Sequence, residues 1–296
     1  GNHHDNFDLW DSKYQPWNSV NMGPKKDLIA GWAKASKKYG LPLGISFHAD
    51  HAWLWYEPAQ RYDINGPKAG IHYDGKLTKA DGKGKWWEGY DPQDLYAQNH
   101  PMSEKSWANN RVHVQWAWSG GACLPTLEYV TNFYDRTLDA INRYNPDLIY
   151  FDVTVAPFHD ISDCGLKIAS HFYNKNLSRK GVQNGVLTIK RIRKGYTLDR
   201  ECSGEDDLQK NPFLVDTPVN PGWFYMGNSL NINKEGGDAG MGSVIQGKTK
   251  DQLRMTAGQI VDNLVDIVSK NGNMMLNVGL RADGSLPETF RDELVK

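Results

Sequence analysis

Residues 146–152, Pro-Asp-Leu-Ile-Tyr-Phe-Asp, constrain the fold of this chain more than any other stretch. Four apolar residues come after a proline that cannot donate to a strand ladder, a pattern typical of a buried parallel strand. The preceding residues, 127–144, carry apolar side chains at steps of three and four, which predicts a helix. A carboxylate that follows such a helix and strand is typical of α/β barrels, whose chemistry lies at the C-terminal ends of the strands. Asp152 is therefore a candidate catalytic residue, although a cap or a loop contact would explain it equally well.

Strands and helices alternate along most of the chain. Apolar periodicity predicts helices at residues 27–39, 127–144, 165–176 and 253–270, and strands at residues 41–48, 148–152, 186–189 and 274–278. Residues 197–202 fit a strand or a loop, residues 213–223 fit an irregular, partly extended segment, and a terminal helix starts near Leu286. This alternation predicts an α/β fold, with a (β/α)8-like TIM barrel as first choice. A doubly wound sheet is the alternative, but no Gly-x-Gly-x-x-Gly motif supports it.

Residues 49–110 interrupt this alternation and are rich in Gly, Lys, Asp and Trp. A connection of this length is usually functional, so we interpret it as a loop insertion over the barrel mouth, within a single catalytic barrel domain spanning residues 1–296. The insertion offers possible platforms for a sugar ring, although each of these side chains would equally well pin the loop to the barrel: Trp53, Trp55, Trp86 and Trp87.

The composition excludes several classes of protein. A net charge of −1 over 296 residues gives no electrostatic argument for a nucleic-acid partner. No apolar run approaches the roughly 20 residues that span a bilayer, so no membrane span is expected. Three cysteines form no disulfide framework, and none of their spacings suits a zinc site. The 11 tryptophans and 14 tyrosines suit sugar faces, and they suit a large core equally well.

The sequence motifs give little support for a metal site or for a catalytic serine. Adjacent histidines on a strand point to opposite sides, so His3 and His4 do not readily share one ion. No His-Glu-x-x-His helix supports His48 and His51, and no Gly-x-Ser-x-Gly elbow is present. We therefore expect no metal and no cofactor. Neutral imidazoles are good hydrogen-bonding partners for sugar hydroxyls, which is the predicted role of His3 and His4.

Paired carboxylates are the chemistry that the sequence favours. Glycoside hydrolysis with retention needs an ionised carboxylate as nucleophile and a second carboxyl roughly 5–5.5 Å away. Asp152 is the candidate nucleophile. The second group should follow another strand, and the candidates in order are Glu201, Asp199, Glu205 and Asp216. An ion pair with Arg200 or Arg193 is the other interpretation of Glu201.

Three motifs resemble the glycoside hydrolase family 29 α-L-fucosidases, in the same order along the chain. They are His-His-Asp-Asn-Phe-Asp-Leu-Trp at residues 3–10, Tyr-Asn-Pro-Asp-Leu-Ile-Tyr-Phe-Asp at 144–152, and Asn-Gly-Asn-Met-Met-Leu-Asn-Val-Gly at 271–279. The resemblance implies a (β/α)8-like catalytic barrel and a retaining exo-glycosidase that needs neither metal nor cofactor. Its substrate would be an oligosaccharide or a polysaccharide ending in α-L-fucose.

The resemblance also assigns roles to residues. Asp152 matches the nucleophile of the family, His3 and His4 match the histidine pair that binds the sugar hydroxyls, and Glu201 resembles the acid/base of one branch. The predicted substrate-binding set is His3, His4, Trp10, His48, Trp53, Tyr150, Arg191 and Trp223.

Departures from the family leave alternatives open. Members carry two more barrel strands before the histidine pair, so we expect N-terminal strands, and any targeting signal, to be missing from this chain. A secreted or periplasmic location is expected, and no oligomeric state is predicted. Leu280-Arg281 replaces a common Pro-Thr. An α-L-galactosidase acting on possibly sulfated polysaccharide fragments, or a non-catalytic sugar-binding protein on a degenerate barrel, are the alternative functions.

Overall fold

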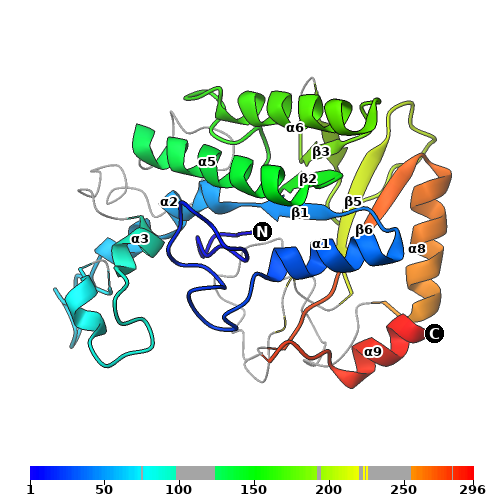
Figure 1. Cartoon of the computed structure of the whole chain (residues 1–296). Coiled ribbons are helices and arrows are strands. Elements are labelled where there is room, and N and C mark those ends of the chain that lie inside the picture. Colours follow the sequence, from blue (N-terminus) through cyan, green and yellow to red (C-terminus); the bar gives the residue numbers. More distant parts are fainter. Residues whose placement is uncertain are drawn as a thin grey trace. The chain divides into compact units, whose positions relative to one another are not determined.

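The computed structural model describes residues 1–74, 76–97, 124–191, 195–219, 223, 225, 255–281 and 283–296 (Figure 1). The chain divides into two compact units, Gly1–Tyr196 and Thr197–Lys296. Each unit contains three of the described strands and has helices of its own. The organisation as a single catalytic domain stays a prediction.

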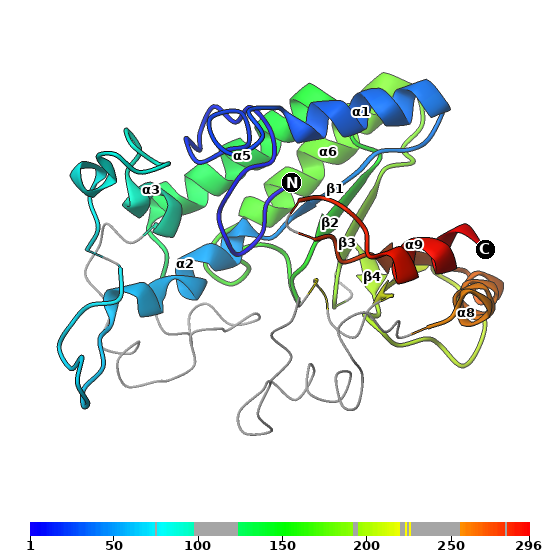
Figure 2. The ribbon, with the colours of Figure 1, turned by 90° about the horizontal axis from the view of Figure 1, so that it is seen from below.

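The first unit is built on three parallel strands in the order β1-β2-β3: β1 (Gly44–Phe47), β2 (Leu148–Phe151) and β3 (Val186–Ile189). Phe47 is paired with Phe151, so β1 and β2 end in register. Helices α1 (Leu28–Tyr39), α5 (Leu127–Tyr144) and α6 (Cys164–Lys180) lie along one side of these strands (Figure 2). The predicted strands and helices of this unit are confirmed, with small differences at their ends.

Local sequence signals set the ends of these helices. The Asp27 side chain accepts a hydrogen bond from the Ala30 N–H at the start of α1, and Thr126 does the same for Tyr129 in α5. Gly40 ends α1 in the left-handed region, with φ of 68°, where glycine has no side chain to clash. Asn145 ends α5 in the same region, with φ of 50°.

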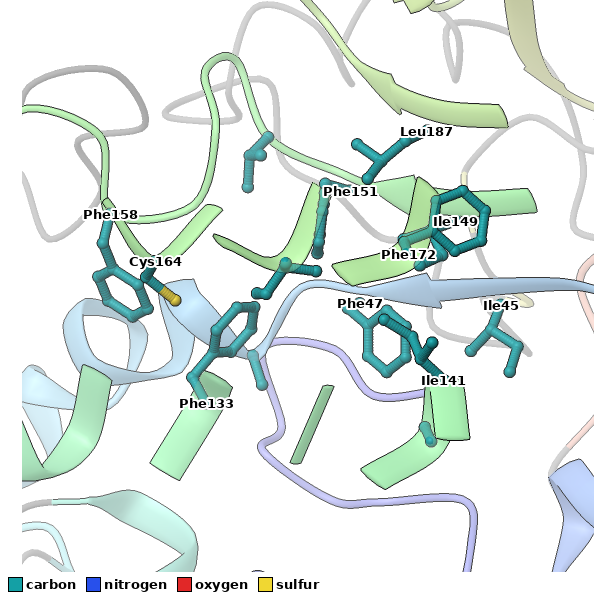
Figure 3. Packing of buried hydrophobic residues seen from close by; sticks show 14 of the residues in the cluster. Ile45, Phe47, Phe133, Ile141, Ile149, Phe151, Phe158, Cys164, Phe172 and Leu187 are labelled. Atoms are coloured by element: carbon teal, nitrogen blue, oxygen red, sulfur yellow. The ribbon is translucent and has the colours of Figure 1, made fainter. Parts of the chain in front are cut away.

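The core of the first unit lies between the strands and the helices that cover them. Phe47 and Phe151 pack side by side at a ring-centroid distance of 6.2 Å, and Phe133 from α5 contacts both Phe151 and Phe158 (Figure 3). Ile45, Ile149 and Leu187, one from each strand, are almost fully buried. The strands are held by this apolar packing, which places the ends of β1, β2 and β3 at one rigid edge.

The described part of the predicted insertion contains short helices. It contains η1 (Ala49–His51), α2 (Ala52–Trp55), η2 (Glu57–Gln60), η3 (Lys79–Gly82) and α3 (Pro92–Tyr96). Trp87 packs with Trp17 and Met22 in a separate hydrophobic cluster, so this tryptophan pins the segment to the N-terminal loop. Residues 98–110 of the predicted insertion lie outside the described residues.

The second unit contains β4 (Thr197–Asp199), β5 (Phe213–Pro218) and β6 (Gly272–Asn277), which are parallel in the order β4-β5-β6. Its helices are α8 (Ala257–Ser269) and α9 (Glu288–Val295). The prediction of an irregular segment at residues 213–223 was wrong for its first part, because β5 is a regular strand buried at all six positions. The sequence pattern did not indicate a strand because the apolar run ends at Val215 and is followed by Asp216, Thr217 and Pro218.

An α/β architecture with parallel strands is confirmed. The part of the chain that the structure describes has six strands, and the eight strands of a complete TIM barrel are not confirmed. None of the described helices is both long and apolar enough to cross a membrane.

Gly272, the first residue of β6, provides a test of packing in the second unit. A Cβ at this position would lie 2.6 Å from Phe213 Cζ and 2.7 Å from Ile267 Cγ2. We expect Gly272→Ala to lower the free energy of unfolding by about 1–3 kcal/mol, because the ring and the helix must move apart. In the control, Gly258→Ala in α8, the nearest atom is Thr256 Oγ1 at 4.0 Å, and alanine should stabilise the helix by up to about 1 kcal/mol. Urea unfolding followed by circular dichroism compares the two, and effects of the same sign would contradict the prediction.

Candidate active site

Three polar residues gather where three neighbouring strands end. His48 directly follows β1, Asp152 directly follows β2 and Lys190 directly follows β3. The carboxyl ends of parallel strands meet at one edge, so the register of the strands brings these side chains together. Lys190 Nζ lies 2.8 Å from Asp152 Oδ1, and His48 Nδ1 lies 3.3 Å from Asp152 Oδ2.

The N-terminal loop adds His3 to this group. His3 Nε2 lies 3.4 Å from Asp152 Oδ2, and the Tyr150 hydroxyl donates to Asp152 Oδ1 at 3.5 Å. The side chains of His3 and Asp152 are 56% and 26% exposed, whereas the side chain of His48 is only 2% exposed. A ligand can therefore approach Asp152 from the side of His3, while His48 supports the carboxylate from within.

The histidine rings are packed against one another. The rings of His3 and His48 stack with centroids 4.7 Å apart, and the ring of His4 meets His48 edge-on at 4.1 Å. The ring of Trp55 lies 4.3 Å from His4. Trp55 is thus placed beside the histidines, and about half of it is exposed.

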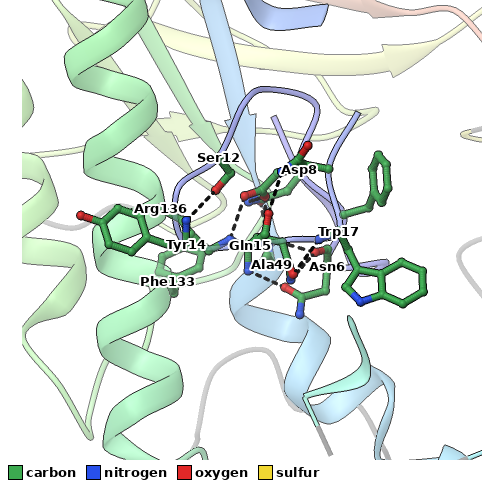
Figure 4. A network of polar contacts seen from close by, with 12 residues as sticks. Asn6, Asp8, Ser12, Tyr14, Gln15, Trp17, Ala49, Phe133 and Arg136 are labelled. Atoms are coloured by element: carbon green, nitrogen blue, oxygen red, sulfur yellow. Dashed lines mark hydrogen bonds and ion pairs between the residues drawn. The ribbon is translucent and has the colours of Figure 1, made fainter. Parts of the chain in front are cut away.

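The loop that carries His3 and His4 is fastened by a buried polar network. Arg136 from α5 binds Asp8 through two nitrogens, Nε at 3.0 Å and Nη2 at 2.5 Å, and also contacts Asn6 (Figure 4). Asp8 accepts from Asn2 Nδ2 at 2.9 Å, and Asn2 Oδ1 accepts from the backbone N–H of His48 at 3.2 Å. This chain of contacts links α5, through the loop, to the end of β1.

The electrostatic surroundings keep Asp152 ionised. Burial alone would raise the pKa of its carboxyl, but contacts with His3 and His48 and the charge of Lys190 hold that pKa well below its usual value. Burial lowers the pKa of His48 to about 4, although the neighbouring Asp152 acts in the opposite direction. Near neutral pH Asp152 is therefore ionised and the His48 imidazole is neutral. An ionised carboxylate is the form that can act as a nucleophile.

Two of the predicted sugar contacts, Trp10 and Trp53, are buried. Trp10 is fully buried, and its Nε1 donates to Asp139 Oδ2 at 3.1 Å, so it belongs to the core. Trp53 is 3% exposed and packs against Tyr129 with ring centroids 5.0 Å apart. Trp53 lines a cavity of about 380 Å³ whose lining does not include Asp152 or the histidines around it. Both side chains are thus buried in the first unit, and their contacts with a substrate stay predictions.

The remaining predicted residues lie in different surroundings. Tyr150 is buried beneath Asp152, and Arg191 is exposed next to Lys190. Glu201 and Trp223 belong to the second unit, where Trp223 is half-buried. Their contacts with a substrate stay predictions.

Glu201 follows β4 after one intervening residue. Its backbone N–H donates to Asp199 Oδ1 at 3.0 Å, and its φ of 28° is unusual for a residue with a side chain. Arg200 forms an ion pair with Glu205. The suggested pairing of Glu201 with Arg200 stays a prediction. Arg193 lies outside the described residues.

The sequence interpretation gave no role to Lys190 or to the network of Asn2, Asp8 and Arg136. Lys190 begins the basic run Lys-Arg-Ile-Arg-Lys at residues 190–194. Its position directly after a predicted strand was the available signal, the same signal that identified Asp152. The network had no such signal, because it joins α5 to a loop more than a hundred residues away in sequence.

Comparisons with known proteins agree with this architecture. The family model "Alpha-L-fucosidase" matches residues 1–236 and 240–296. An α-L-fucosidase of Dictyostelium discoideum is 21% identical over 243 residues, which cover 79% of this chain and 50% of that protein. A putative α-L-fucosidase of Caenorhabditis elegans is 21% identical over 299 residues, with coverage of 99% and 45%.

Solved structures give the same result for the fold. The crystal structure of Thermotoga maritima α-fucosidase is similar with a TM-score of 0.58 and 22% identity, and the match covers 99% of this chain and 49% of that one. The α-L-fucosidase isoenzyme 1 of Paenibacillus thiaminolyticus is similar with a TM-score of 0.54 and 19% identity, with coverage of 99% and 56%. The chain spans about half the length of the curated relatives it matches. Since the family model covers nearly the whole sequence, the chain belongs to the α-L-fucosidase family.

Proposed function

We propose that this chain is part of a retaining exo-glycosidase that releases terminal α-L-fucose from oligosaccharides or polysaccharides, with Asp152 as the nucleophile. The observation that carries the proposal is a partly exposed carboxylate at the end of β2 whose pKa is held well below its usual value. Membership of the α-L-fucosidase family supports the choice of sugar. The fucose complex solved for the Thermotoga maritima enzyme shows that a member of similar fold binds this sugar.

The proposed reaction has two displacement steps. Asp152 attacks the anomeric carbon while Glu201 gives a proton to the leaving oxygen, which yields a covalent glycosyl ester. Glu201 then takes a proton from water, the water attacks the same carbon, and the ester bond to Asp152 breaks. The configuration is inverted twice and therefore retained.

The neighbours of Asp152 have complementary roles in this proposal. His3, with more than half of its side chain exposed, hydrogen-bonds the sugar hydroxyls together with His4. Lys190 and His48 hold the carboxylate ionised and oriented. Trp55, beside His4, offers a ring face for the apolar side of the sugar.

Azide rescue tests the role of Glu201. We expect Glu201→Ala to lower kcat on a natural-type fucoside by about 100-fold or more, as removal of general acid catalysis does. Azide should restore the turnover of an activated aryl α-L-fucoside and give an α-fucosyl azide, because azide attacks the ester on Asp152 without needing a base. Product configuration is read by NMR. Wild-type rates in Glu201→Ala would assign the acid/base role to another carboxyl, with Asp199, Glu205 and Asp216 as the next candidates in that order.

A second candidate substrate is an α-L-galactoside, possibly sulfated. The observation in its favour is the exposed Arg191 next to Lys190, because a guanidinium binds sulfate oxygens in a bidentate manner. Aryl α-L-fucoside and aryl α-L-galactoside, each with and without sulfate, separate the two by kcat/KM. Binding of fucose without turnover of any glycoside would instead support a non-catalytic sugar-binding protein.

A further inference from the structure

The three polar groups around one oxygen of Asp152 have the spacing of metal ligands. His3 Nε2, His48 Nδ1 and one Asp152 carboxylate oxygen all lie within 4.8 Å of one another. Asp152 Oδ2 is 3.4 Å from the first nitrogen and 3.3 Å from the second. Two ligands of a tetrahedral ion with bonds of about 2.0–2.1 Å are about 3.3–3.4 Å apart. The two distances to Asp152 Oδ2 therefore match two edges of a zinc tetrahedron, while the three ligand atoms together lie within 4.8 Å.

His48 provides an independent indication of a ligand. It is 2% exposed, and neither of its ring nitrogens makes a well-formed hydrogen bond among the described residues, although Nδ1 lies 3.3 Å from Asp152 Oδ2. Buried polar atoms are normally satisfied, so an unsatisfied imidazole aimed at Asp152 is unusual. An ion bound to Nδ1 would satisfy one of the two nitrogens.

The donor set decides which ions fit. Two imidazole nitrogens and one carboxylate oxygen are the ligands of open zinc sites, where the fourth position holds water or substrate. Mg²⁺ and Ca²⁺ prefer oxygen ligands only. His3, with 56% of its side chain exposed, gives an ion access to this position.

Lys190 limits how strongly such an ion can bind. Its ammonium lies 2.8 Å from Asp152 Oδ1, the oxygen that is not shared with the histidines. An ion at Oδ2 keeps this contact intact, but the two positive charges on one carboxylate repel each other. An ion held in this way exchanges with solvent.

We propose that His3, His48 and Asp152 bind one exchangeable Zn²⁺ ion, or a similar transition-metal ion, that competes with the sugar for Asp152 Oδ2. Its inhibitory consequence rests on the proposed function, in which the Asp152 carboxylate is the nucleophile. The sequence motifs did not indicate these three ligands, because only histidines close in sequence were compared, His3 with His4 and His48 with His51. The three ligands come from a loop and two strand ends.

A titration with Co²⁺ tests the site without any need for turnover. Tag-free protein should bind one equivalent with the strong visible absorption of four-coordinate cobalt, and Zn²⁺ should displace it. We expect His3→Ala to weaken Zn²⁺ binding, measured by calorimetry, at least about tenfold. The matched control is His171→Ala in α6, where the ring contacts Asn142 and the affinity should not change.

Activity gives the second readout. Zn²⁺ should inhibit hydrolysis of an aryl fucoside competitively, and EDTA should restore the rate. If no glycoside is turned over, the proposed function fails while the cobalt spectrum still decides the metal site. Absence of stoichiometric binding, or an unchanged affinity in both His3→Ala and Asp152→Asn, overturns the metal proposal.

Discussion

Replacing Asp152 with asparagine is expected to lower kcat on an aryl α-L-fucoside by at least about a thousandfold, which corresponds to about 4 kcal/mol of activation free energy. The amide has nearly the same shape but is neutral, so it cannot form the glycosyl ester at a useful rate. It also loses the charge that Lys190 faces at 2.8 Å. KM should change much less than kcat, because His3 and His4 still contact the sugar.

Two further variants make this result specific. Asp147 directly precedes β2, at the opposite end of the strand from Asp152, and it pairs with Arg179 and Lys180. Asp147→Asn should therefore leave kcat close to that of the parent. Asp152→Ala with azide should release a β-fucosyl azide, since azide attacks the face that the carboxylate no longer occupies. Near-parental turnover of Asp152→Asn would exclude this residue as the nucleophile.

The second large effect is expected on stability, from Arg136→Met. The Arg136 and Asp8 side chains are 1% and 0% exposed, and the substitution leaves the Asp8 carboxylate buried without its partner. Breaking a buried ion pair in this way costs about 3–5 kcal/mol, whereas an exposed pair contributes about 0–1 kcal/mol. Lys167→Met, which removes an exposed pair with Asp163 in α6, is the control. Chemical denaturation followed by tryptophan fluorescence measures both.

Arg136→Met should also affect substrate binding at the candidate active site. Asp8 holds Asn2, which in turn binds the backbone of His48, so loosening this network should displace His3 and raise KM for the fucoside. Equal losses of stability in Arg136→Met and Lys167→Met would show that the network contributes no more than a surface pair.

Local patterns made much of the fold predictable. Helix α5 was predicted from its apolar period at residues 127–144, the bounds it has in the structure, where Thr126 and Asn145 cap its ends. Strand β5 was not predicted, since Asp216 and Thr217 are polar although the strand is buried along its length. Their burial depends on neighbouring strands, which a local pattern does not contain.

The candidate site was predictable where it follows strands. Asp152 was found from the strand before it, and Lys190 occupies the equivalent position after β3. The contacts of His3 with Asp152 and of Arg136 with Asp8 join residues more than a hundred positions apart. No spacing rule connects them, so only the folded chain shows that His3 lies beside the Asp152 carboxylate.

The direct placement of His48, Asp152 and Lys190 after their strands restricts how this family member can change during evolution. Side chains alternate between the two faces of a strand, so lengthening β1, β2 or β3 by a single residue would turn the functional group away from its neighbours. Loops beyond these positions are free of that constraint and can diverge in length. New specificities are therefore expected to arise from loop exchange downstream of the three residues, with the lengths of the strands unchanged.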